Sequence, residues 1–269
     1  MLKNIAVILW LLIPYSYLFS QEPVSEDQGT AFYIYTESEF CSKYIFRGIV
    51  LEDNRVFQPA VYAGYTAPGK LGTFSAGVWF NFSMSNDQNL LNEITGKYEI
   101  YKKPFTYNET DLYLMHEMTF KELSLKNTFA VYLFTEETGY PNTTEYILNT
   151  SYPLGQFSLA NEFACDISAY PGAFVFTHGL NWENEITDGL CFASGVNLIW
   201  GGAKYNSVNA GIKKVLINSL GFDASFTYSH RSGFYTKLRY QYNNIPEDVI
   251  RQSYGYDTWF LGLLAGFTF

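Results

Sequence analysis

The chain lacks most of the features that mark a cofactor-dependent enzyme or a nucleic-acid-binding protein. It has three cysteines, an odd number, and no two of them have the spacing of a metal or redox pair. A phosphate-binding loop, a Rossmann glycine set and a zinc motif are all missing. Basic residues are scarce, with 17 lysines and arginines against 26 acidic residues, which argues against nucleic acid as a partner. We therefore expect no cofactor, no bound metal and no nucleic acid.

Long apolar runs are also missing beyond the N-terminus. Residues 1–20 carry a single charge, Lys3, followed by the apolar run Ile5–Pro14 and a small residue, Ser20. These are the n-region, h-region and cleavage site of a secretory signal peptide. The run is too short for a transmembrane helix, which needs ~20 residues. We expect a cleaved signal peptide at 1–20, a short lead at 21–30 and one domain at 31–269.

Aromatic residues, by contrast, make up 19% of the chain, and apolar and polar residues alternate with period two in nearly every segment after residue 30. In Ala31–Arg47 the apolar face is Phe32, Ile34, Phe40, Tyr44 and Phe46, and the polar face is Tyr35, Glu37, Glu39, Lys43 and Arg47. The same alternation is found in Thr73–Ser83, Asp111–Lys121, Gln156–Ser168, Ala173–Ile186 and Leu190–Trp200. One face suits lipid and the other suits a wet interior, as in a transmembrane β-barrel.

The last segment, Asp257–Phe269, favours a barrel that closes on itself. One of its faces carries Trp259, Leu261, Leu263, Ala265, Phe267 and Phe269. An open edge this apolar would invite aggregation, whereas pairing with the first strand leaves no edge. The ending is also similar to the C-terminal recognition signal of bacterial outer-membrane proteins. That resemblance implies that the barrel-assembly machinery recognises the strand ending at Phe269.

The connections between the segments alternate between short and long, which predicts tight turns at one end of the barrel and freer loops at the other. Short turns are expected at 67–71, 121–124, 153–155, 187–189 and Asn218–Ser219. Both termini then lie at the short-turn end, which requires an even number of strands. Because the alternation continues unbroken through Leu220–Tyr242, we interpret that stretch as one long strand rather than two meeting at residues 231–233. The fold class is therefore all-β, a single antiparallel up-and-down transmembrane β-barrel of twelve strands.

One stretch resembles the opening motif of the TorF-type porins. Ser42–Ile49 reads SKYIFRGI, and that family begins with a strand of the form S-x-Y-x-F-R-G. Gln58-Pro59-Ala60 and Gly77–Asn81 are similar to the family's next two strands, whereas Lys43 and the insertion Ser85–Asn108 depart from its pattern. The resemblance implies a twelve-stranded barrel in the bacterial outer membrane that passes small solutes.

Charged side chains fall on the face expected to line the barrel interior. The residues expected on the solute path are Glu37, Glu39, Lys43, Arg47, Trp79, Asp111, Glu117, Glu162, Asp166, Glu183, Glu185, Lys213, Asp223, Arg231, Lys237 and Arg239. They would make a lumen selective for ions or small polar solutes, or else an interior filled by salt bridges. A barrel of this size lies between small filled barrels and open porins. For Arg47 we favour an ion pair with an acid on a neighbouring strand or loop over a ligand contact.

Two other interpretations remain open beside a non-enzymatic channel that contacts outer-membrane lipid and small solutes. His230 and Ser232 form an H-x-S tripeptide that resembles outer-membrane phospholipase A and could serve nucleophilic catalysis in a lipid hydrolase. That family, however, follows its serine with Asn, where this chain has Gly233. The third interpretation is a structural or adhesive barrel whose Met84–Asn108 loop contacts a partner.

Overall fold

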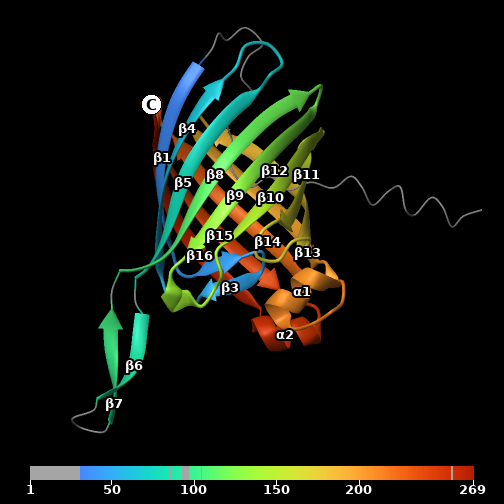
Figure 1. Ribbon diagram of the computed structural model, residues 1–269. Helices are drawn as coiled ribbons and strands as arrows, with labels where there is room; N and C mark the ends of the chain where they lie inside the picture. The colour runs from blue at the N-terminus through green and yellow to red at the C-terminus, as the bar shows by residue number, and fades with distance from the viewer. Residues whose placement is uncertain (1–30, 85, 93–96, 104, 256) are drawn as a thin grey trace, which may run out of the picture.

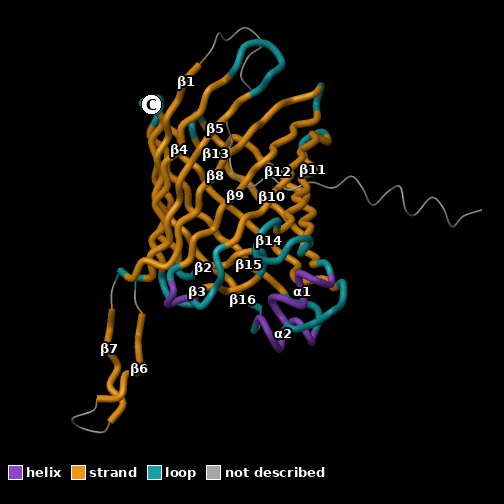
Figure 2. Tube along the Cα trace, in the orientation of Figure 1, coloured by secondary structure: helices purple, strands orange, loops and turns teal. Residues whose placement is uncertain are grey.

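The computed structural model describes residues 31–84, 86–92, 97–103, 105–255 and 257–269. The expected signal peptide and lead lie outside the described residues. The described chain forms one closed antiparallel barrel of twelve strands, in agreement with the sequence prediction (Figures 1 and 2). Its strands, in their order around the wall, are β1 (Ala31–Cys41), β4 (Val56–Thr66), β5 (Thr73–Ser83), β8 (Thr106–Phe120), β9 (Leu123–Phe134), β10 (Thr143–Leu154), β11 (Phe157–Asp166), β12 (Phe174–Thr187), β13 (Leu190–Gly201), β14 (Leu216–Ser229), β15 (Phe234–Asn244) and β16 (Thr258–Thr268). No helix among the described residues is long and apolar enough to cross a membrane.

The first and last strands close the wall. β1 and β16 pair antiparallel, with Phe40 opposite Leu263 and Tyr35 opposite Thr268. The backbone N–H of Phe269 donates to the carbonyl of Ile34 at 2.8 Å, so the pairing reaches the last residue. The predicted alternation holds in β16, where Trp259, Leu261 and Leu263 are exposed on the outer face and their neighbours are buried.

Three tyrosines lie flat against the inner wall because glycines on adjacent strands leave room for their rings. A Cβ on Gly77 would lie 2.0 Å from the ring of Tyr62, its cross-strand partner. Tyr33 covers Gly64 and Tyr235 covers Gly266 in the same way. These rings therefore add apolar contact to the wall while projecting little into the lumen.

The short and long connections segregate to opposite ends, as the sequence predicts. The short turns are 67–72, 121–122, 155–156, 188–189 and 230–233. Both described ends of the barrel lie beside these turns (Figure 1). The long connections carry the hairpins β2 (Tyr44–Phe46) with β3 (Ile49–Glu52) and β6 (Asn86–Asn92) with β7 (Lys97–Lys103), and the helices η2 (Glu136–Thr138), α1 (Ala203–Ala210) and α2 (Asp248–Tyr254). We call this end the loop end.

One side chain organises the connection that carries α2. The carboxylate of Asp257 accepts hydrogen bonds from the backbone N–H of Ile245 at 3.1 Å, from Asn244 at 2.9 Å and from the hydroxyl of Tyr242 at 3.0 Å. The hydrogen bond from Ile245 is the main reason that the pKa of Asp257 lies below its usual value. The ionised carboxylate therefore ties the two ends of the connection together.

The interpretation of Leu220–Tyr242 as one strand is wrong. β14 ends at Ser229 and β15 begins at Phe234, with a turn at 230–233 between them. The expected turn at Asn218–Ser219 is also wrong, because both residues lie inside β14, where its pairing with β13 shifts register. Both side chains are fully buried there. The count of twelve is still correct, since the chain leaves the wall over 202–215 and folds partly into α1.

The interpretation of Ala31–Arg47 as one strand is wrong as well. β1 ends at Cys41, and the following residues form the β2–β3 hairpin, which turns into the barrel. Arg47 and Gly48 form its two-residue turn with φ values of 49° and 83°, a combination typical of hairpin turns that glycine favours. A Cβ at Gly48 would also lie 2.7 Å from the Cβ of Ser219 on the wall. The chain therefore bends inward at a position where only a glycine fits.

Because the chain bends inward here, two residues that the sequence analysis placed on the outer face lie inside the barrel. Tyr44 and Phe46, expected to face lipid, lie inside, where the Tyr44 ring is 5.6 Å from that of Trp79 and the Phe46 ring is 5.9 Å from that of Tyr132. The hairpin therefore fills part of the lumen at the loop end.

Candidate functional site

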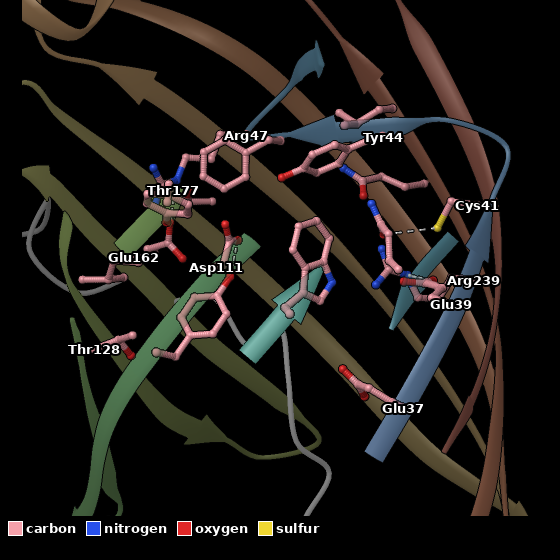
Figure 3. A pocket seen from close by; sticks show the side chains of 18 of the residues that line it. Glu37, Glu39, Cys41, Tyr44, Arg47, Asp111, Thr128, Glu162, Thr177 and Arg239 are labelled. Carbon is pink, nitrogen blue, oxygen red and sulfur yellow. Dashed lines mark hydrogen bonds and ion pairs between the residues drawn. The ribbon is translucent and has the colours of Figure 1, made fainter. Parts of the chain in front are cut away.

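The lumen contains a cavity of about 340 Å³ beside the β2–β3 hairpin (Figure 3). Its lining includes side chains from the hairpin and from strands around the wall, among them Glu37, Asp111, Glu162 and Arg239. These side chains reach the cavity because alternate residues of each wall strand point inward. The cavity is therefore lined by charged groups of both signs and by aromatic rings.

Arg47 connects the tip of the hairpin to the opposite wall. Its Nη1 lies 2.9 Å from Oε1 of Glu145 on β10, and its Nε lies 2.9 Å from Oε1 of Glu162 on β11. The hydroxyl of Tyr132 donates to the second oxygen of Glu145 at 3.0 Å. The Arg47 side chain is 7% exposed, so both ion pairs are shielded from bulk water. The expected ion pair is present, but its partners lie on two strands of the opposite wall rather than on a neighbouring strand or loop.

A second ion pair lies across the lumen from the first. Nε of Arg239 on β15 is 3.2 Å from Oε1 of Glu39 on β1, and the guanidinium lies 5.0 Å from the centre of the Phe260 ring. The two side chains meet over Gly262 of β16, where a Cβ would lie 2.3 Å from Oε1 of Glu39. Charged groups therefore lie on opposite sides of the same cavity (Figure 3).

Acidic side chains also cluster on β8. Glu109 and Asp111 are two residues apart on its inner face, and both are buried. The hydroxyl of Tyr113 donates to Oδ2 of Asp111 at 2.6 Å, and Tyr44 of the hairpin bonds to Glu109. The expected solute path omitted Glu109, although the family resemblance implied an acidic strand with both Glu109 and Asp111, and the alternation puts the two on one face.

The residues expected on the solute path differ in where the structure places them. Those that line the cavity are Glu37, Glu39, Lys43, Arg47, Trp79, Asp111, Glu162 and Arg239. Five more point inward from the wall but do not line the cavity, namely Glu117, Glu183, Glu185, Asp223 and Lys237. Asp166 is also buried on the inner face, directly opposite Glu145, at the loop end of β11. Lys213 and Arg231 lie in connections between strands, so their placement on the solute path is wrong.

These three residues lie at or beyond the ends of the wall strands. Asp166 lies at the end of β11, where its Oδ1 accepts the backbone N–H groups of Ser168 and Tyr170 and so shapes the following turn. Lys213 is exposed in the segment between α1 and β14, which leaves the wall. Arg231 lies in the exposed turn at 230–233, with its Nη2 3.2 Å from Oδ2 of Asp188. Both corrections, for Lys213 and Arg231, follow directly from the misplaced strand boundaries between 202 and 242.

His230 and Ser232 come together, but in the same exposed turn. Nδ1 of His230 lies 2.9 Å from Oγ of Ser232, and the backbone N–H of Ser232 donates to the same nitrogen at 3.2 Å. These are the short-range contacts of a turn, and the described residues show no third side chain bonded to the ring. The arrangement offers a nucleophile and a base without a group that orients the base.

Comparison with known proteins finds similarity in fold. No protein-family model matches the chain, and no curated protein matches it in sequence. An outer membrane channel from Pseudomonas putida F1 is 11% identical, with a TM-score of 0.50 over 92% of this chain and 99% of that one. The NanC porin is 9% identical, with a TM-score of 0.50 over 87% of this chain and 98% of the porin. At these identities the likeness shows a shared closed-barrel fold.

Proposed function

We propose that this protein is a porin-like channel of the bacterial outer membrane that passes small polar or ionic solutes through its charged lumen. It acts without a catalytic step, and its Ser42–Ile49 motif resembles the opening motif of the TorF-type porins. The fold supports this proposal, because a closed barrel with apolar aromatic residues outside and charged residues inside is stable in a bilayer. The two structural neighbours are themselves named as a channel and a porin.

The observation that carries the proposal is the charged cavity inside the barrel. A barrel that serves only as a support could fill its interior with apolar side chains, which avoids the cost of burying charge. Here Arg47 and Arg239 each form ion pairs with acids across or along a cavity of about 340 Å³. Polar groups around open space are the elements from which channels build selectivity.

Planar-bilayer recording tests this proposal. The detergent-purified protein should produce discrete current steps in potassium chloride. A variant lacking residues 43–53, which removes the hairpin from the lumen, should give larger steps because the bore widens. Detergent alone and heat-denatured protein are the controls. Silence from both the complete protein and the shortened variant would rule out a conducting channel.

A non-conducting adhesive or structural barrel is the second candidate, and two features favour it. The β2–β3 hairpin occupies part of the lumen, and the β6–β7 hairpin projects away from the loop end of the barrel (Figure 1). A projecting hairpin of this kind could present a surface to a partner. Silence in the bilayer would favour this candidate over the channel.

The membrane location leads to two further proposals. Outer-membrane lipid contacts the aromatic outer face, and the barrel-assembly machinery recognises the C-terminal strand that ends at Phe269. Export through a signal peptide at residues 1–20 precedes both steps.

A further inference from the structure

One long connection at the loop end is basic, although the chain as a whole is acidic. Residues 202–215, which contain α1, carry Lys204, Lys213 and Lys214 and no acidic residue. The other long connections that carry charge all contain acids, and 135–142, for example, has two glutamates and no base. All three lysines are exposed. Three positive charges therefore lie in one surface segment of the loop end.

This basic segment lies just beyond an aromatic belt on the outer face of the wall, with α1 beside the end of β13 (Figure 1). The ring of Trp200 on β13 stacks on that of Phe176 with centres 4.8 Å apart, and Phe174 meets it edge-on at 6.1 Å. Such belts mark the boundary between hydrocarbon and headgroups. Ile217 pairs with Trp200 in the wall, so Lys214 lies three residues past the belt, at most ~10 Å at ~3.3 Å per residue. A headgroup layer is ~5–8 Å thick, and flexible lysine side chains at this level can reach it.

Exposed apolar side chains accompany the lysines. Val215, directly after Lys214, is 58% exposed, and Ile217 on the outward face is 37% exposed. Val208 of α1 is also exposed. Acyl chains can cover these side chains while the lysines meet a charged headgroup, whereas a free anion in solution would leave them uncovered.

The lysine charges are not cancelled by ion pairs. No ion pair among the described residues involves any of the three lysines. On α2, which contacts α1, Oδ1 of Asp248 lies 3.4 Å from Nη1 of Arg251. Nζ of Lys204 donates to the carbonyl oxygen of Pro171 at 2.5 Å, which holds the ammonium at the loop end without neutralising it. The segment therefore offers positive charge to a negative partner.

We propose that the surface formed by Lys204, Lys213, Lys214, Val215 and Ile217 binds the phosphate groups of a lipid headgroup in the outer leaflet. This inference rests on the proposed location in the outer membrane, with the long connections outside. The lysines pair with the phosphates, and the two apolar side chains contact the upper part of the acyl chains. A lysine near an anionic membrane surface raises affinity about fivefold, so three lysines together raise it about a hundredfold.

Native mass spectrometry of the protein in non-ionic detergent measures this binding, with bisphosphorylated lipid A as the probe. The test variant removes the three charges of the loop end through Lys204→Gln, Lys213→Gln and Lys214→Gln. It should bind lipid A about a hundredfold more weakly than the unmodified protein, and each single substitution should cost about fivefold. The matched control removes three exposed bases in the turns of the opposite end through Lys70→Gln, Lys121→Gln and Arg231→Gln. Its net charge is the same as that of the test variant, and its affinity should stay unchanged.

The outcomes separate a lipid site from its alternatives. Equal affinity in the test variant and the unmodified protein would overturn the inference, and so would an equal loss in the control variant, which would indicate a general effect of net charge. Lipid A without its phosphates should bind the unmodified protein as weakly as lipid A binds the test variant. Displacement of lipid A by excess inorganic phosphate would indicate a site for a free anion and refute the lipid assignment.

The binding measurement is independent of conductance. If the bilayer stays silent while the three lysines are needed for lipid A binding, the channel proposal fails and the lipid site stands. If the protein conducts but does not bind lipid A, only the lipid site fails. All six substituted side chains are exposed, and unchanged mobility on semi-native gels checks that both variants keep the barrel fold.

Discussion

Replacement of Arg47 should release the β2–β3 hairpin from the lumen. Arg47→Met keeps the length of the side chain and removes its two bonds to Glu145 and Glu162 at 2.9 Å each. Hydrogen bonds to charged groups contribute ~1.5–3 kcal/mol each, so the docked hairpin loses ~3–6 kcal/mol. Release of the hairpin lets water reach both carboxylates, so the expected loss of free energy lies near the lower end of this range, ~3 kcal/mol. A loss of ~3 kcal/mol raises the released population about a hundredfold.

The native Cys41 reports on this release. It is 5% exposed and packs against Tyr44 and Ile45 of the hairpin, so departure of the hairpin should uncover its thiol. In a background of Cys165→Ser and Cys191→Ser, a charged methanethiosulfonate reagent should modify Cys41 about a hundredfold faster in Arg47→Met than in the parent, following the population shift worked out above.

Lys43→Met is the matched control for this experiment. Lys43 bonds to Asp53 within the same connection, and Asp53 is largely exposed, so the pair does not tie the hairpin to the wall. Exposed pairs of this kind contribute little, and the labelling rate should stay close to that of the parent. Equal labelling rates in Arg47→Met and the parent would refute the idea that Arg47 holds the hairpin.

Three further predictions follow from the wall and the loop end. Gly77→Ala should cost ~1–3 kcal/mol because its new Cβ would lie 2.0 Å from the Tyr62 ring, and a lower unfolding temperature on semi-native gels would show it. In a Tyr62→Ala background the same substitution should cost much less, and an undiminished cost would contradict the steric cause. Since the folded-state pKa of Asp257 is depressed, its stabilising effect is present above the unfolded value of ~3.9 and is lost as pH falls through the folded value. The protection factor of the Ile245 amide, which corrects for the slower intrinsic exchange in acid, should therefore fall at low pH, and Asp257→Asn should show the low protection already at pH 7. Deletion of Phe269 should reduce the folded fraction in outer membranes, because the closing pair of strands loses its last backbone contact. An undiminished folded fraction would count against recognition through that residue.

The sequence revealed the wall of the barrel better than its interior. Alternation with period two indicates which side chains share a face, and this was enough to place β16 and its outward aromatic residues correctly. The same signal cannot tell whether a strand stays in the wall. Tyr44 and Phe46 continue the phase of β1, but the Arg47–Gly48 turn redirects them inward through backbone angles that the alternation does not encode.

The misplaced turn has a comparable cause. Asn218 and Ser219 are typical turn residues, yet they lie in β14 where an extra residue shifts its register, and Asn218 bonds to Asn206 of α1 at 2.7 Å. The side chain that fixes the bulge belongs to a helix that sequence periodicity did not reveal. The sequence did not show which acids pair with Arg47 either, because an ion pair across the lumen joins residues that no local pattern relates.

The distance along the chain between Arg47 and its partners has a consequence for the order of events during biogenesis. The hairpin emerges immediately after the first strand, but its partners Glu145 and Glu162 come 98 and 115 residues later. The β2–β3 hairpin therefore cannot form both of its ion pairs with the wall until β10 and β11 are part of the sheet. In a partly assembled barrel the hairpin lacks these ion pairs. Their formation shows that the wall opposite β1 is in place.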